Sequence, residues 1–146
     1  MQKVIPKGDI PKYLNGERTS CKGFMTTAKD SKHLDNYSKI YHGMRLDYDG
    51  TAFNLSDGSC GAIRFKASNS NSAIVPINIE SPDAFPFTNH GFTSGKNGLL
   101  GVPEWKLNSF ADLDNGSAEL WEIFNDGTEV LRAVYDINLH KFVPTN

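Results

Sequence analysis

The sequence predicts a single α+β domain, made mainly of antiparallel β-strands with one or two short helices. Short runs in which apolar and polar residues alternate recur along the chain, and this is the period of half-buried strands. Thirteen glycines and seven prolines, spread along 146 residues, indicate many turns between short elements. A chain of this length can bury one hydrophobic core, so residues 1–146 are expected to form one domain, alone or within a longer protein.

The first third of the chain is expected to hold two short strands and one short helix. The strands are predicted at "KVIP" (3–6) and at "KGFMTTA" (22–28). Ser31 is expected to cap a helix over "KHLDNYSK" (32–39), in which apolar residues three positions apart share one face.

The next stretch, "KIYHGMRLDYDG" (39–50), is predicted to form a strand that ends in a tight turn. Ile40, His42, Met44 and Leu46 alternate with more polar residues, which is typical of a half-buried strand. The Asp-Gly pair that follows is a turn signal.

Two side chains of this stretch are candidates for chemistry, and the alternation separates them. His42 would lie on the apolar face, where a histidine is more often a hydrogen-bonded core residue than a catalytic group. Arg45 would point the other way, where pairing with Asp47 or Asp49 contributes little stability. At most one of the two can contact a ligand, unless the strand is bulged near Gly43, which permits close backbone approach.

The rest of the chain is predicted to be mainly β-structure. Residues 80–98 form the longest aperiodic stretch and are expected to be a functional or mobile loop. The clearest feature is the hairpin "SAELWEIFNDGTEVLRAVYDI" (117–137), in which two alternating runs flank "NDG". Further strands are predicted at 60–67, at 73–79 (an edge strand, because of Pro76), at 99–107 and at 140–143.

Charge and cysteine content exclude several classes of function. The net charge is −2 and the pI about 6.0, without a basic stripe, so extended binding of duplex DNA is not expected. Cys21 and Cys60 lack the spacing of a metal site; they can pair, but the expectation is two reduced core thiols. The sequence contains no apolar run of about 18 residues, so no membrane span is predicted. The first residues also lack the apolar part of a signal peptide.

The segment "IYHGMR" (40–45) resembles the first core strand of ADP-ribosyltransferases, in which a Tyr-His-Gly or Tyr-Arg-Gly segment meets the nicotinamide end of NAD. This resemblance implies two packed antiparallel sheets with few helices. It also implies that Tyr41, His42, Gly43 and Arg45 contact NAD, which would be a substrate.

Two further segments resemble the serine or threonine strand that follows in that family. "FKASNS" (65–70) puts Ser68 at the serine position. "GFMTTA" (23–28) also resembles this strand, but it precedes the His-Gly segment and is therefore out of the family's order.

The resemblance further implies a catalytic glutamate. Cleavage of the nicotinamide–ribose bond develops positive charge on the ribose, which a nearby carboxylate stabilises. The candidates are Glu104, Glu119 and Glu122, and Glu104 is preferred because it follows the glycine-rich loop, where the family has its glutamate. The family's Glu-x-Glu is here Glu-x-x-Glu, a spacing that puts the two hairpin glutamates on opposite faces of a strand. Phe92, like Tyr41, can stack on nicotinamide.

The predicted function is that of a small NAD-consuming toxin domain, the C-terminal effector of a larger delivered protein. It would transfer ADP-ribose to a target protein or RNA, or hydrolyse NAD. The expected location is outside the producing cell or in the cytoplasm of a target cell, and a cognate immunity protein is an expected partner.

Two other functions remain open on the sequence. A metal-free RNase needs a general base, a general acid and a cation for the phosphate, and His42, His90 and Lys96 are of these types. A β-rich binding module without enzymatic activity would use the aromatic side chains as core or interface residues.

Overall fold

The computed structural model describes residues 1–74, 102–103, 105–114 and 117–145. Within these ranges the strands are β1 (Gln2–Pro6), β2 (Gly23–Met25), β3 (Ser59–Arg64), β4 (Trp105–Leu107), β5 (Glu119–Phe124), β6 (Glu129–Asp136) and β7 (Lys141–Pro144). The helices are α1 (Ile10–Leu14), α2 (Tyr37–Gly43) and the single 3₁₀ turns η1 (Lys7–Asp9), η2 (Leu55–Asp57) and η3 (Ser70–Ser72).

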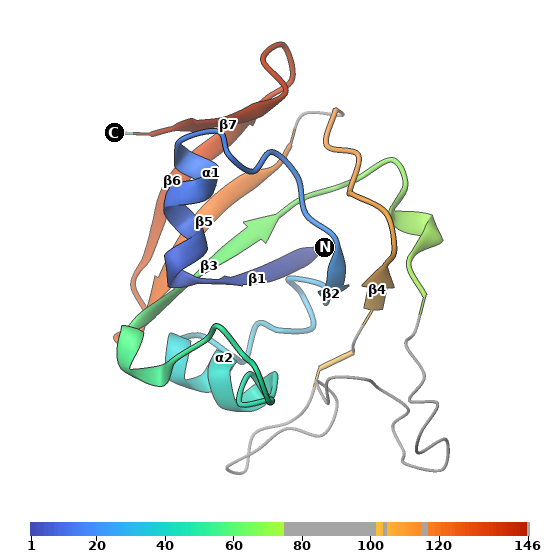
Figure 1. Cartoon of the computed structure of the whole chain (residues 1–146). Helices are drawn as coiled ribbons and strands as arrows, with labels where there is room; N and C mark the ends of the chain where they lie inside the picture. Colours follow the sequence, from blue (N-terminus) through green and yellow to red (C-terminus); the bar gives the residue numbers. More distant parts are fainter. Residues whose placement is uncertain (75–101, 104, 115–116, 146) are drawn as a thin grey trace.

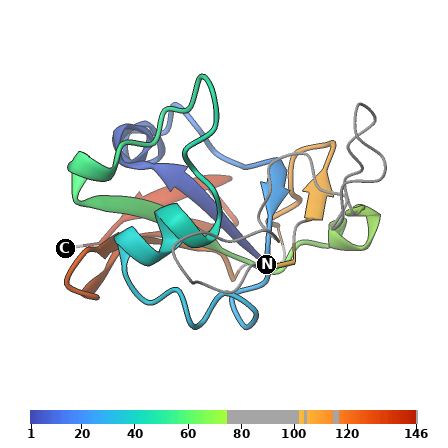
Figure 2. The ribbon, with the colours of Figure 1, turned by 90° about the horizontal axis from the view of Figure 1, so that it is seen from below.

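The strands form two antiparallel sheets, which confirms the predicted α+β class. The larger sheet has the strand order β1-β3-β5-β6-β7, and the smaller one pairs β2 with β4. Figures 1 and 2 both show the small sheet beside the N-terminal end of β1, so the first strand lies at the junction of the two sheets.

A hydrophobic core covers each face of the larger sheet. Ile5 packs with α1 in one core, whereas Val4, its neighbour on the strand, packs with α2 in the other. Cys21 belongs to the first core and Cys60 to the second, and both are free buried thiols, as expected. Burial raises the pKa of each thiol to about 12.

The hairpin predicted at 117–137 is confirmed. β5 pairs with β6 through a turn in which Gly127 has φ +86°, a conformation that favours glycine. Strands also overlap the segments predicted at 3–6, 22–28, 60–67, 99–107 and 140–143, while the one predicted at 73–79 falls almost wholly outside the described residues.

The strand predicted at 39–50 is wrong, because residues 37–43 form helix α2. Asn36 caps this helix with its side chain, which accepts a hydrogen bond from the Lys39 N–H (2.8 Å). Tyr37, Ile40 and Met44 are three and four residues apart and share the buried helix face, so the same apolar residues fit the helical period.

The helix predicted at 32–39, with Ser31 as its cap, is also wrong. Ser31 lies in a turn and is buried, and its Oγ donates to the carbonyl of Thr27 (3.0 Å). Only residues 37–39 of the predicted segment are helical, since the cap is Asn36 rather than Ser31.

Gly61 of β3 allows the larger sheet to pack closely against the first core. A Cβ at this position would lie 2.5 Å from Ile5 Cγ1 and 3.1 Å from Ile10 Cγ1. Gly61→Ala is therefore expected to lower the free energy of unfolding by about 1–3 kcal/mol, measured by urea denaturation. Gly8→Ala, where a Cβ meets nothing within 4 Å, is the control and should change it by less than about 0.5 kcal/mol. Equal stability of the two variants would contradict the packing argument.

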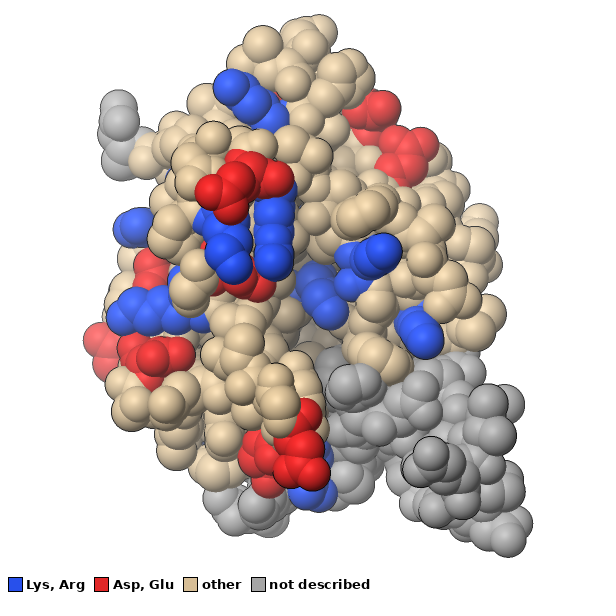
Figure 3. All heavy atoms as spheres, viewed as in Figure 1, with Lys and Arg blue, Asp and Glu red and all other residues tan. Residues whose placement is uncertain are grey.

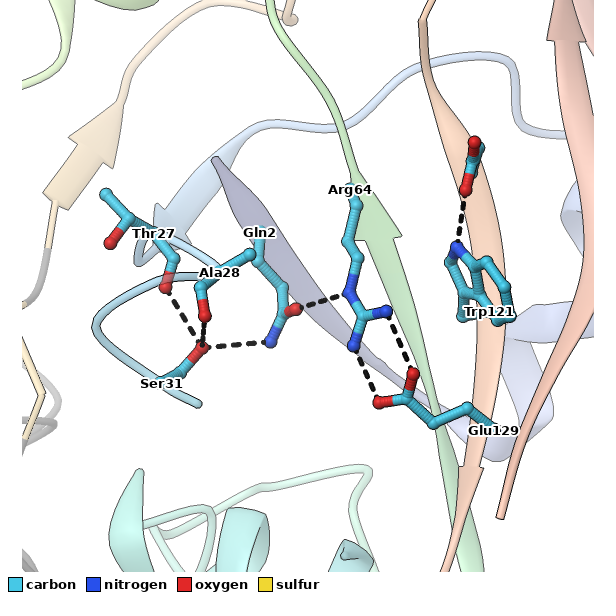
Figure 4. A network of polar contacts seen from close by, with 8 residues as sticks. Gln2, Thr27, Ala28, Ser31, Arg64, Trp121 and Glu129 are labelled. Atoms are coloured by element: carbon cyan, nitrogen blue, oxygen red, sulfur yellow. Dashed lines mark hydrogen bonds and ion pairs between the residues drawn. The ribbon is translucent and has the colours of Figure 1, made fainter. Parts of the chain in front are cut away.

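A polar network ties the N-terminal strand to the middle of the larger sheet (Figure 4). Arg64 of β3 binds both carboxylate oxygens of Glu129 (2.8 and 3.0 Å), and its Nε donates to Gln2 Oε1 (2.9 Å). The Gln2 amide in turn donates to Ser31 Oγ (3.3 Å). This network holds the first residues of β1 in place, where the two sheets meet.

Candidate functional site

A cleft opens where β1 and β2 separate. The Gln2 N–H donates to the Thr26 carbonyl (2.6 Å) and the Thr26 N–H donates to the Gln2 carbonyl (3.0 Å), which joins the two strands at this point. If this antiparallel pairing continued, Val4 would face Phe24, but the described residues form no bridge there. The strands diverge instead, and the cleft that opens at the outer edge of β1 has a volume of about 830 Å³.

The divergence leaves the backbone of β1 open at Val4. Because hydrogen bonds alternate along an antiparallel strand, Gln2 and Val4 both direct their N–H and C=O away from β3. The outward N–H and C=O of Gln2 are both hydrogen-bonded to Thr26, and Pro6 has no N–H. Among the described residues of this edge, Val4 is therefore the one that offers both an N–H donor and a C=O acceptor. We call this the open edge of β1. A primary carboxamide carries the matching acceptor and donor side by side.

Lys3 puts a cation beside the open edge. Its Nζ donates to the Phe24 carbonyl (2.8 Å) and so reaches from β1 across the gap to β2. Burial lowers the pKa of Lys3 from its ordinary value, because the ammonium is partly removed from water. A cation in such surroundings attracts an anionic group more strongly than one in bulk water does.

The rest of the cleft is lined by rings and charges. Its aromatic and charged side chains, besides Lys3, are Asp9, Tyr13, Glu17, Arg18, Lys22, Tyr48, Phe53 and Phe110. On the face seen in Figure 3, several Lys and Arg side chains lie across the middle of the molecule, and Asp and Glu side chains lie among those on the left. The volume lies within the range of small-molecule sites, about 300–1,000 Å³. The cationic side chains, the aromatic side chains and the backbone N–H and C=O of Val4 together suit an anionic ligand with a planar ring, such as a nucleotide.

The two carboxylates of the cleft differ in their surroundings. Asp9 binds Lys12 Nζ (2.9 Å) and an Arg18 terminal nitrogen (2.7 Å), so its charge is balanced by two cations. Glu17 is exposed, accepts a hydrogen bond from the Asn15 amide (3.5 Å) and forms no ion pair with a described residue. Glu17 is thus the carboxylate of the described lining that is available to a positively charged group.

The residues predicted to hold NAD near His42 do not line this cleft. Tyr41, His42 and Gly43 lie on α2, and Arg45 follows it with its Nε 3.1 Å from Asp47 Oδ1. The rings of Tyr41 and His42 meet edge to face, and His42 Nδ1 is buried without a hydrogen-bond partner among the described residues. Since this segment is a helix, the separation of His42 from Arg45 by strand alternation does not apply. Gly43 makes room for the Leu34 side chain, 2.5 Å from its would-be Cβ.

Ser68 and Glu119 also lie away from the cleft lining. Ser68 Oγ donates to Asp112 Oδ2, which lowers the pKa of that carboxyl group. Glu119 Oε2 accepts a hydrogen bond from Trp121 Nε1 (2.7 Å). Both side chains are therefore engaged with neighbours on the surface of the fold.

Glu122 is buried in the larger sheet. Its Oε1 accepts a hydrogen bond from Ser59 Oγ (2.7 Å), and its Oε2 lies 3.6 Å from Arg132 Nε. The register of β5 with β3 is regular from Glu119 to Phe124, so the odd spacing puts Glu119 and Glu122 on opposite faces. The two hairpin glutamates are not brought together.

Four residues named from the sequence lie outside the described residues, namely Phe92, His90, Lys96 and Glu104. In the sequence, Glu104 immediately precedes β4. Trp105, the first residue of β4, pairs with Met25 of β2. The strand that follows Glu104 is thus the hydrogen-bonded neighbour of β2, which begins directly after Lys22 of the cleft lining.

Sequence reasoning missed Lys3 and Val4. Lys3 did carry a signal, because alternation along β1 puts it on the same face as Ile5, and lysines are rarely buried. Val4 carried none, since the opening of a strand edge depends on where β1 and β2 diverge.

Within the described ranges, no three or more His, Cys, Asp and Glu side chains are grouped so as to hold a metal ion, and no helix has the length and apolar character needed to cross a membrane. No protein-family model matches the chain, and comparisons with curated proteins and with solved structures find no match either.

Proposed function

We propose that this chain binds NAD in the cleft at the open edge of β1 and cleaves its nicotinamide–ribose bond, as an ADP-ribosyltransferase or an NAD glycohydrolase. The observation that carries the proposal is the N–H and C=O pair of Val4, which has no partner among the described residues, with the Lys3 ammonium beside it. We propose for the chain the same toxin role that the resemblance implies.

The chemistry of the cleft suggests how NAD would lie. The nicotinamide carboxamide would pair with Val4, and its ring would stack on Tyr48 or Phe53. The diphosphate would then lie near Lys3 and Lys22, whose ammonium groups attract its negative charge.

The segment that contains β2 supports the proposal in place of the His-Gly segment. Because "IYHGMR" is helical, it does not supply the core strand that the resemblance implies, whereas "GFMTTA" does contain a strand that is joined to β1. Thr26, which directly follows β2, pairs with Gln2 of β1 next to the cleft; its Oγ1 is buried without a partner among the described residues, although Thr26 is not part of the cleft lining. β2 pairs with β4, which follows Glu104. A hydroxyl, a cation and a glutamate are the groups that the resemblance assigns to NAD.

The proposed reaction needs a single stabilising carboxylate. As the bond between ribose C1′ and the nicotinamide nitrogen breaks, its electron pair leaves with nicotinamide and positive charge develops on the ribose. A glutamate carboxylate, for which Glu104 is the first candidate, stabilises this charge. Water or a nucleophile of a target then forms the new bond to C1′ and releases its proton to solvent.

The test is release of nicotinamide from NAD, followed by chromatography with and without cell lysate as a source of acceptors. Turnover that is inhibited by nicotinamide, and much less by nicotinic acid, is expected, since a carboxylate has no N–H to offer the Val4 carbonyl and brings negative charge against it. Absence of release under both conditions, with the protein folded, would overturn the proposal.

A further inference from the structure

Next to the cleft, two lysine side chains each contact a phenylalanine ring. The residues belong to β2, to β4 and to the segments that adjoin these two strands. Lys22 Nζ lies 4.6 Å from the centroid of the Phe110 ring, and Lys106 Nζ lies 5.3 Å from that of Phe24. Phe24 and Lys106 are directly opposite in the β2–β4 ladder. The Ala111 N–H donates to the Cys21 carbonyl (2.7 Å), which brings Phe110 beside Lys22. We call Lys22, Phe24, Lys106 and Phe110 the Lys–Phe surface.

The charges of this surface are not neutralised within the described part of the chain. Neither Lys22 nor Lys106 has a carboxylate within ion-pair distance there, in contrast to Lys12 and Arg18, which both bind Asp9. Each ammonium lies over a ring instead, a contact that leaves it able to attract an anion.

Phe110 is the second unusual feature of the surface. Its side chain is 60% exposed, although it belongs to a segment that is anchored to the core through Ala111 and Leu113. Phe110 and Lys22 also line the cleft, so the Lys–Phe surface and the proposed NAD site are continuous.

Aromatic side chains next to lysines that form no ion pair with a described residue are suited to binding a single-stranded nucleic acid. Its bases stack on aromatic side chains, and its phosphates are attracted by ammonium groups. An acidic peptide would use the two lysines but would leave the exposed ring of Phe110 without a stacking partner. Two cations at this surface are too few to hold a duplex by its backbone, which agrees with the net charge of −2.

We propose that the Lys–Phe surface binds a single strand of nucleic acid, and that this strand is the acceptor of ADP-ribose from the adjacent cleft. The transfer rests on the proposed function, whereas the binding does not. In the transfer, a base nitrogen forms the new bond to ribose C1′ and loses its proton to solvent, while nicotinamide leaves with the electrons of the old bond.

Binding is tested without NAD, by fluorescence anisotropy with a labelled 12-nucleotide oligouridylate. Phe110→Ala is expected to weaken binding about five-fold or more, the smallest loss typical of a removed stacking partner. Lys22→Ala with Lys106→Ala should lower the slope of log K against log salt by about 1.4. Lys29→Ala, an exposed lysine outside the cleft lining, is the matched control and should bind like the unchanged protein.

Transfer is tested with NAD labelled in the adenosine part, offered together with the oligouridylate, a mixed-sequence RNA of the same length and a 12-residue oligoglutamate peptide. Label that is removed by nuclease supports the proposal. Label found on protein or peptide instead, cleavage of the RNA without NAD, or unchanged RNA binding in both variants would each overturn it. RNA binding that depends on Phe110 while no nicotinamide is released would support the binding of RNA by this surface, and would refute the NAD reaction together with the transfer that rests on it.

Discussion

Replacing Lys3 by methionine is expected to weaken the binding of NAD about 10- to 100-fold, measured by calorimetry. The substitution keeps an unbranched apolar stem in place but removes the ammonium that lies between β1 and β2 and that we assign to the diphosphate. Charge-assisted hydrogen bonds of this kind contribute about 1.5–3 kcal/mol, which sets the size of the loss. Lys3→Arg, which keeps the charge, is the matched control.

The dependence on pH separates the charge of Lys3 from its packing. Because burial lowers the pKa of Lys3, the unchanged protein should lose affinity for NAD as the pH rises toward a value below that of an ordinary lysine. Lys3→Arg should keep its affinity over the same range, since a guanidinium stays protonated. A flat profile for the unchanged protein, or full affinity in Lys3→Met, would remove Lys3 from the site.

Glu104→Gln is expected to lower the rate of nicotinamide release about 100- to 1,000-fold while the affinity for NAD changes little. The amide has nearly the same shape as the carboxylate but cannot stabilise positive charge on the ribose. Glu119→Gln and Glu122→Gln should leave the rate unchanged, because these side chains are held by Trp121 and Ser59 outside the cleft lining.

Glu17→Gln is the informative companion, since Glu17 is the unpaired carboxylate in the described lining of the cleft. If Glu104→Gln turned over at the normal rate and Glu17→Gln did not, the stabilising role would belong to Glu17. If all four variants kept the normal rate, a carboxylate-assisted cleavage would be contradicted.

Much of the larger sheet could be predicted from local patterns. The β5–β6 hairpin combines alternation with a turn whose glycine has a positive φ, and such signals do not depend on distant parts of the chain. Helix α2 was mistaken for a strand because its apolar residues fit both periods. The capping side chain of Asn36, three residues before Lys39, was the local signal that favoured the helix.

The candidate site was less accessible to sequence reasoning. Lys3 and Val4 become functional candidates only because β1 and β2 pair at Gln2 and Thr26 and then diverge, which is a relation between segments more than 20 residues apart. Histidine and arginine near Gly43 attracted attention by their chemistry, yet neither His42 nor Arg45 lines the cleft.

The central claim is that nicotinamide pairs with the backbone of Val4, and the Val4 amide proton tests it most directly. In a protein labelled with ¹⁵N, added nicotinamide should shift the Val4 amide resonance and slow its exchange with water, and nicotinic acid should do so far less. NAD should reproduce the effect of nicotinamide. An unchanged Val4 resonance at concentrations that saturate NAD binding or turnover would show that the open edge of β1 is not the nicotinamide site.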